Sequence, residues 1–125
     1  MQRKAQMLSK LAKLAEIRSD TELRRFAAFR SHIDALTVQQ VEARSRLAGL
    51  FVQDDAFSIE GARLVNQEAG RLAREGARLD AELDRLRPGY DVARQRAMRE
   101  FGRVRALEQI AAEVHAKTRK SNSRN

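Results

Sequence analysis

The chain has 125 residues and a mass of 14.2 kDa, which is the size of one domain. Alanine fills 20 positions, charged residues make up 34%, and cysteine and tryptophan are absent; this composition is typical of long helices and coiled coils and excludes a disulfide framework, a thiolate metal site and most β folds. The 25 basic residues outnumber the 17 acidic ones, and the resulting net charge of +8 points to an acidic partner: nucleic acid, anionic lipid or an acidic protein surface.

Residues 3–52 are predicted to form the first helix, because apolar side chains recur at alternating spacings of three and four residues. We call the residues at these spacings the seam, since they are expected to face a second helix. In the first helix the seam is Leu8, Ala12, Ala15, Ser19, Glu22, Phe26, Phe29, Ile33, Leu36, Gln40, Ala43, Leu47 and Leu50. Residues 19–22 have the spacing of a capping box, but inside a charged helix we interpret them as a coincidence and not as a new helix start.

Residues 53–57 are predicted to form the turn of a helical hairpin. Asp54 and Asp55 stand just before Ser58, and acidic residues and serine at this place favour a helix N-terminus.

Residues 58–118 are predicted to form the second helix, whose three-four pattern runs for seven heptads. Its seam is Ala62, Val65, Ala69, Leu72, Gly76, Leu79, Leu83, Leu86, Tyr90, Ala93, Ala97, Glu100, Val104, Leu107, Ala111 and Val114. The phase continues through Pro88 and Gly89, which favours one long helix kinked there; a three-helix bundle is the alternative. The fold class is therefore all-α, a long antiparallel two-helix coiled-coil hairpin over residues 1–118, and residues 119–125 are predicted to be a disordered basic tail.

The charge is unevenly distributed along the predicted hairpin. Net charges are +5 for residues 1–52, −2 for residues 53–87 and +5 for residues 88–125. Antiparallel folding would bring the two basic blocks together where both termini meet. A solvated helix face explains a run of charge equally well, but here the charge coincides with an apolar stripe at Met7, Leu11 and Leu14 that is wider than one seam needs.

Steering charge beside an apolar anchor suits a protein socket better than a phosphate backbone, which proteins bind with groove-reading motifs or exposed stacking aromatics. The candidate partner-binding residues are therefore Met7, Leu11, Leu14, Lys10, Lys13, Arg99, Arg103, Arg105 and Leu107.

We find no catalytic or metal-binding pattern and expect neither an enzyme nor a cofactor. His32 and His115 stand 83 positions apart without a cysteine or second histidine at ligand spacing. The glycines lack the strand and the Gly-Lys-Ser/Thr sequence of a phosphate loop. Lys10 and Lys13 interrupt the N-terminal apolar stretch, and no apolar run approaches the roughly 20 residues that span a bilayer, so we expect no signal peptide, no membrane span and a cytoplasmic location.

The layout of the chain and the heptad-patterned basic segment Arg103-Val104-Arg105-Ala106-Leu107-Glu108-Gln109-Ile110, with its Leu-Glu pair, resemble the FliJ family of flagellar export proteins and its YscO-like type III secretion counterparts. The resemblance implies a two-helix stalk without enzymatic activity, whose terminal end enters the ring of the export ATPase while the rest meets the membrane protein of the export gate. It also implies export chaperones as partners and a position peripheral to the inner membrane. The ATPase-binding end would be the region of Met7 to Leu14 together with Val104 to Lys120.

Two other interpretations stay open. The net charge would also fit a basic helical nucleic-acid-binding protein. The stretch Arg3 to Arg18 is basic and amphipathic, as in helices that lie on a membrane surface.

Overall fold

The structure is a computed structural model that describes residues 2–52 and 58–123. Helix α1 spans Gln2–Leu50 and helix α2 spans Ile59–Ser123. The predicted all-α helical hairpin is confirmed, because these two helices pack against each other and no described residue lies in a strand. The predicted turn at residues 53–57 lies outside the described residues.

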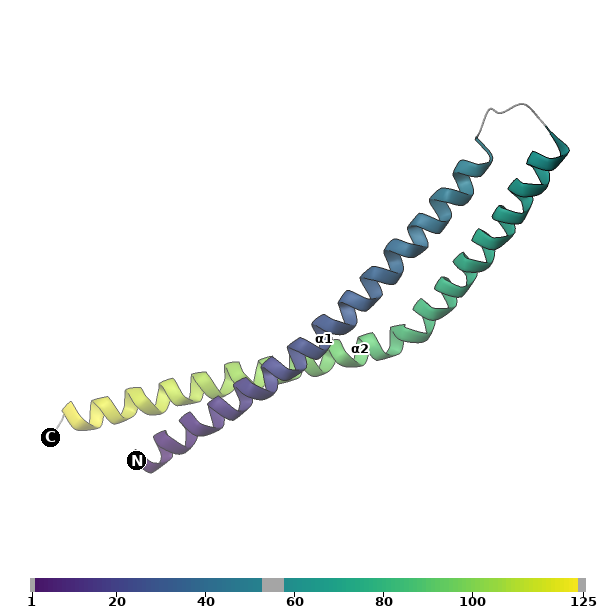
Figure 1. Cartoon of the computed structure of the whole chain (residues 1–125). Coiled ribbons are helices and arrows are strands. Elements are labelled where there is room, and N and C mark those ends of the chain that lie inside the picture. The colour runs from purple at the N-terminus through teal and green to yellow at the C-terminus, as the bar shows by residue number, and fades with distance from the viewer. Residues whose placement is uncertain (1, 53–57, 124–125) are drawn as a thin grey trace. The chain divides into compact units, whose positions relative to one another are not determined.

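The packed helices form two compact units, and each unit contains a segment of both helices, which lie side by side in Figure 1. Unit 1 consists of Met1–Ala28 and Asp91–Asn125, and unit 2 is Phe29–Tyr90. Each unit therefore has its own interface between antiparallel helical segments.

The three-four pattern correctly identifies the residues between the helices. Every seam residue predicted above is buried or half-buried in the structure. The buried apolar side chains of the described residues all belong to the seam and are Leu36, Ala43, Leu72 and Leu79 in unit 2 and Ala15, Ala97 and Val104 in unit 1.

Ser58 begins helix α2 as its N-cap. Its Oγ accepts a hydrogen bond from the Gly61 N–H at 2.9 Å, and its carbonyl accepts one from the Ala62 N–H at 2.9 Å. Glu60 adds a negative charge to the first turn, where the helix dipole favours it.

Helix α2 continues through Pro88, so the alternative of a three-helix bundle is wrong. Proline has no N–H to donate to the carbonyl four residues earlier. Packing across the interface offsets this loss: the Phe29 and Tyr90 ring centroids lie 6.4 Å apart, and Leu86 is half-buried. Gly89 leaves room for this packing, since a Cβ there would stand 3.0 Å from Cζ of Phe29.

The C-terminal ends of both helices differ from the sequence interpretation. Helix α1 ends at Leu50, two residues before the predicted end at residue 52. Residues 119–123 are helical, although we expected disorder from residue 119; residues 124–125 lie outside the described part. The pattern stopped at Val114, yet half-buried Thr118 extends the seam by one step and donates a hydrogen bond from its Oγ1 to the Val114 carbonyl at 2.9 Å. Helix α1 is continuous through residues 19–22, which confirms that this tetrad starts no new helix.

Candidate docking surface

The residues of each helix can be lettered a to g in successive heptads, with the seam residues at positions a and d. These letters show which residues of the two helices lie opposite each other. In unit 2 Arg44 and Asp80, both at e, form a cross-helix ion pair with Nη2 and Oδ1 3.5 Å apart. On the other side of the seam the g positions oppose each other: Arg46 lies near Glu68, and His32 lies near Glu82. At these two levels of unit 2 a basic residue of α1 thus lies opposite a glutamate of α2, and at the level between them Gln39 lies opposite Glu75.

Helix α2 of unit 2 repeats the sequence Glu-x-x-Arg-Leu three times, at residues 68–72, 75–79 and 82–86; the leucines belong to the seam and the arginines are exposed. Each arginine holds the preceding glutamate through two hydrogen bonds, with Nη2 to Oε1 distances of 2.6, 2.6 and 2.5 Å and Nε to Oε2 distances of 3.1, 3.3 and 3.0 Å. These hydrogen bonds are the main cause that lowers the pKa of each glutamate carboxyl; the charge of Arg46 adds to the effect at Glu68, and that of His32 at Glu82. The acids and bases of unit 2 therefore neutralise one another locally.

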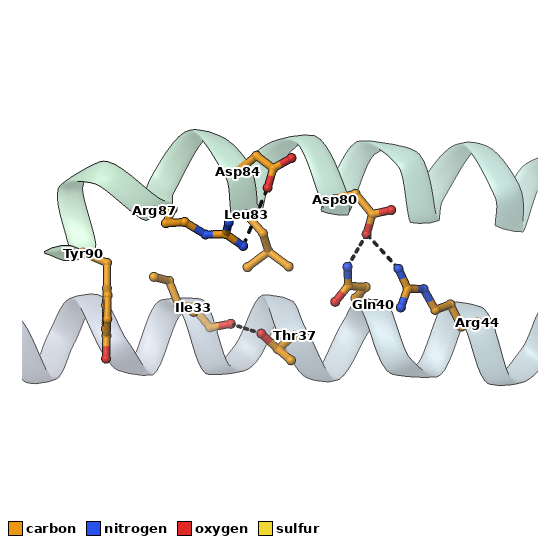
Figure 2. A pocket seen from close by; sticks show the side chains of 9 residues that line it. All are labelled: Ile33, Thr37, Gln40, Arg44, Asp80, Leu83, Asp84, Arg87 and Tyr90. Atoms are coloured by element: carbon orange, nitrogen blue, oxygen red, sulfur yellow. Dashed lines mark hydrogen bonds and ion pairs between the residues drawn. The ribbon is translucent and has the colours of Figure 1, made fainter.

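A groove of about 590 Å³ lies beside the seam of unit 2. Residues from Ile33 to Arg44 line it on α1, and residues from Asp80 to Tyr90 line it on α2. Figure 2 shows that Asp80 accepts hydrogen bonds from Gln40 Nε2 and Arg44 Nη2 there, while Arg87 faces Asp84 at 3.9 Å. Because the charged groups drawn in this groove pair with each other, it offers no unmatched charge to a ligand. Gln40 is a polar residue at a seam position, and such residues fix the register of coiled coils.

Unit 1 has a different surface. Its sequence ranges contain 16 basic and 7 acidic residues, against 9 and 10 in unit 2. Two ion pairs join described residues of unit 1, Arg25 with Glu22 and Arg103 with Glu100, whereas unit 2 has five. Most of the excess positive charge of the chain is therefore on unit 1 and without a carboxylate partner among the described residues.

All nine residues predicted to bind a partner belong to unit 1. Lys10, Lys13, Arg99, Arg103 and Arg105 are exposed, as the prediction requires. The apolar stripe is exposed too, at 63% for Met7, 45% for Leu11 and 59% for Leu14. Leu107 differs, because it is half-buried at a d position and packs in the seam.

The heptad register separates these residues into two sides of unit 1. Met7 and Leu14 at c, Leu11 at g, Arg99 at c and Arg103 at g share the side of the seam where g positions oppose each other. Lys13 and Arg105 occupy b positions on the opposite side, and Arg105 stacks there over the Phe101 ring, with Cζ 5.8 Å from the ring centroid.

The c and g residues of unit 1 form one continuous surface that we call the c/g face. Besides the five predicted residues just named, it contains Lys4, Arg18, Thr21, Arg25, Ala28, Val92, Arg96, Ala106, Ile110, Glu113, Lys117 and Lys120. These residues are absent from the nine predicted from the sequence, because charge and apolar character were followed along each helix separately; assigning g positions on both helices would have found the face.

The seam beneath the c/g face contains the polar residues Ser19, Glu22 and Glu100. Ser19 is 3% exposed, and Glu100 has a buried Oε2 with no hydrogen-bond partner among the described residues. The Oε1 atom of Glu100 pairs with Arg103 at 3.4 Å, and Glu22 pairs with Arg25 at 3.2 Å. Two arginines of the c/g face thus also cover carboxylates of the seam.

Among the described residues no group of three or more histidines, cysteines or carboxylates could hold a metal ion. No described helix is long and apolar enough to cross a membrane. Comparisons with protein-family models, with curated proteins and with solved structures give no match.

Proposed function

We propose that this chain is a non-enzymatic, stalk-like component of a type III protein export apparatus, of the flagellar or virulence kind, that binds the export ATPase ring through unit 1 and couples it to the export gate. The observation that carries the proposal is the pairing of exposed Met7, Leu11 and Leu14 with unmatched arginines on one side of an antiparallel hairpin. An apolar anchor flanked by steering charge is typical of protein docking surfaces. Export chaperones and a position beside the inner membrane belong to the same proposal.

Association with the export ATPase of the same organism tests the proposal. The purified chain should co-elute with the ATPase at about 150 mM salt and stimulate ATP hydrolysis, conditions under which weak surface electrostatics are screened. The combined variant Leu14→Glu with Arg99→Glu should abolish both effects, since both side chains are exposed on the c/g face.

A matched control keeps this test specific. Arg74→Glu reverses an exposed arginine of unit 2 that forms no ion pair with a described residue, so it should leave association unchanged. Helix content, measured by circular dichroism, should be the same in all variants. Wild-type protein that neither co-elutes nor stimulates hydrolysis would overturn the proposal.

A further inference from the structure

The c/g face of unit 1 carries a second three-four apolar stripe. On α1 it runs through Met7, Leu11 and Leu14, whose spacing of four and three residues is that of a coiled-coil seam. On α2 the c/g face has two separate exposed apolar residues, Val92 at 47% and Ile110 at 45%, with arginines between them. The helices of unit 1 already face each other through positions a and d, so this stripe remains open to an additional helix.

The register shows which residues oppose each other on this face. In unit 2 the e positions pair Arg44 with Asp80, and the g positions pair Arg46 with Glu68. To go from the e pair to the g pair, one therefore moves two residues forward on α1 and twelve residues back on α2. In unit 1 the e residues Ser9 and His115 line one groove and mark the same level. The same offset pairs Leu11 with Arg103.

One heptad in either direction completes the ladder of g pairs in unit 1. It pairs Arg18 with Arg96 and Lys4 with Ile110. None of these pairs joins opposite charges, and Arg18 and Arg96 form no ion pair with a described carboxylate. The like charges of Arg18 and Arg96 destabilise an isolated hairpin, in contrast to the basic-acidic g pairs Arg46–Glu68 and His32–Glu82 of unit 2.

We infer that the c/g face of unit 1 binds an acidic amphipathic helix of a partner protein, which completes a three-helix arrangement. Apolar residues of that helix would pack on Met7, Leu11 and Leu14, and its carboxylates would lie beside Arg18 and Arg96. The inference rests on the proposed function for its surface and adds the chemistry of the partner.

Charge complementarity selects this occupant. A second copy of the chain would bring an equally basic unit 1 to the face, and like charges would oppose association. A phosphate backbone would match the arginines but leave the exposed apolar side chains in water. An acidic amphipathic helix satisfies both features together.

The test uses the full chain and a labelled 28-residue peptide with leucine at a and d and glutamate at e and g, with binding followed by fluorescence anisotropy at about 150 mM salt. The same peptide with lysine at e and g is the control probe. We expect the glutamate peptide to bind and the lysine peptide not to bind. The double variant Arg18→Glu with Arg96→Glu should weaken binding at least about tenfold, since it reverses both unpaired charges of one g pair.

Two further variants separate docking from folding. Arg24→Glu reverses a charge at the outer f position of unit 1 and should leave peptide affinity unchanged. The single change Arg18→Glu should weaken peptide binding while keeping or raising the thermal midpoint, because a carboxylate would then face Arg96.

Three results would each overturn the inference. The two peptides could bind equally well, the double variant could keep full affinity, or a single-stranded RNA could bind more tightly than the glutamate peptide and displace it. Peptide binding requires no export ATPase. Binding of the peptide without binding of the ATPase would therefore support this inference and overturn the proposed function. Binding of the ATPase without binding of the peptide would support the proposed function and overturn this inference.

Discussion

The two units use one heptad pattern with different side chains. In unit 2 the buried seam residues are Leu36, Ala43, Leu72 and Leu79, of which three are leucines, and Leu79 has no exposed surface. In unit 1 the buried seam residues are Ala15, Ser19, Ala97 and Val104. Smaller side chains bury less apolar area per turn, so the interface of unit 1 gains less hydrophobic stabilisation.

The surfaces of the two units also differ, in how their charges are paired and in how many apolar side chains they expose. Unit 2 pairs its charges within and between helices, whereas the register of unit 1 sets Arg18 opposite Arg96, and unit 1 exposes the apolar side chains Met7, Leu11 and Leu14. A hairpin segment that is weakly stabilised alone and rich in unmatched groups gains most from a partner. Under the proposed function, unit 2 closes the hairpin and unit 1 binds the partner.

The largest expected effect tests the difference between the cores. Leu79→Ala should lower the free energy of unfolding by about 2–5 kcal/mol, because it leaves a cavity in the best buried part of unit 2. Val104→Ala in unit 1 should cost only about 1–2 kcal/mol, since it removes two methyl groups from a thinner interface. Urea denaturation followed by circular dichroism measures both values. Leu64→Ala, at a side chain that is 66% exposed, is the control and should change little. Equal costs for Leu79→Ala and Val104→Ala would break the comparison.

A smaller effect of opposite sign is expected at Glu100. Its Oε2 is buried without a partner, and an unsatisfied buried polar atom is destabilising. Glu100→Leu should therefore raise the free energy of unfolding by on the order of 1–2 kcal/mol, because leucine suits a d position. Glu108→Leu changes an exposed glutamate of the same helix and should give no such gain. A loss of stability in Glu100→Leu would show that the polar seam of unit 1 is needed for its packing.

The sequence predicted the hairpin, and it predicted the seam residue by residue, because helix periodicity depends on local spacing alone. It did not predict helix at residues 119–123, where Thr118 continues the seam with a polar side chain that an apolar count overlooks. The candidate site was predicted in part: Met7, Leu11 and Leu14 stand out on one helix, but Arg18 and Arg96 gain meaning only from the register that opposes them. Leu107 belongs both to the predicted seam and to the predicted partner-binding residues, and the structure half-buries it at its d position.

The smallest expected effect concerns pH and sharpens the contrast in charge. Arginine hydrogen bonds lower the pKa of Glu68, Glu75 and Glu82 in the folded chain, so these pairs contribute stability fully above the ordinary glutamate pKa of 4.5. That contribution is lost as the pH falls below 4.5 and through the lowered folded-state values, because protonation removes the charge that each arginine holds. The thermal midpoint should therefore fall with acid in this range, as circular dichroism would record.

Replacing the three glutamates by glutamine should lower the midpoint at neutral pH and flatten its acid dependence. The effect should be modest, because exposed ion pairs are screened by water. The matched control replaces Glu108 and Glu113, two exposed glutamates of unit 1 that form no ion pair with a described residue, and should keep the acid dependence of the wild-type chain. If both variants flattened the profile equally, charge pairing would not distinguish the units, and the unmatched arginines of unit 1 would lose their significance as a binding feature.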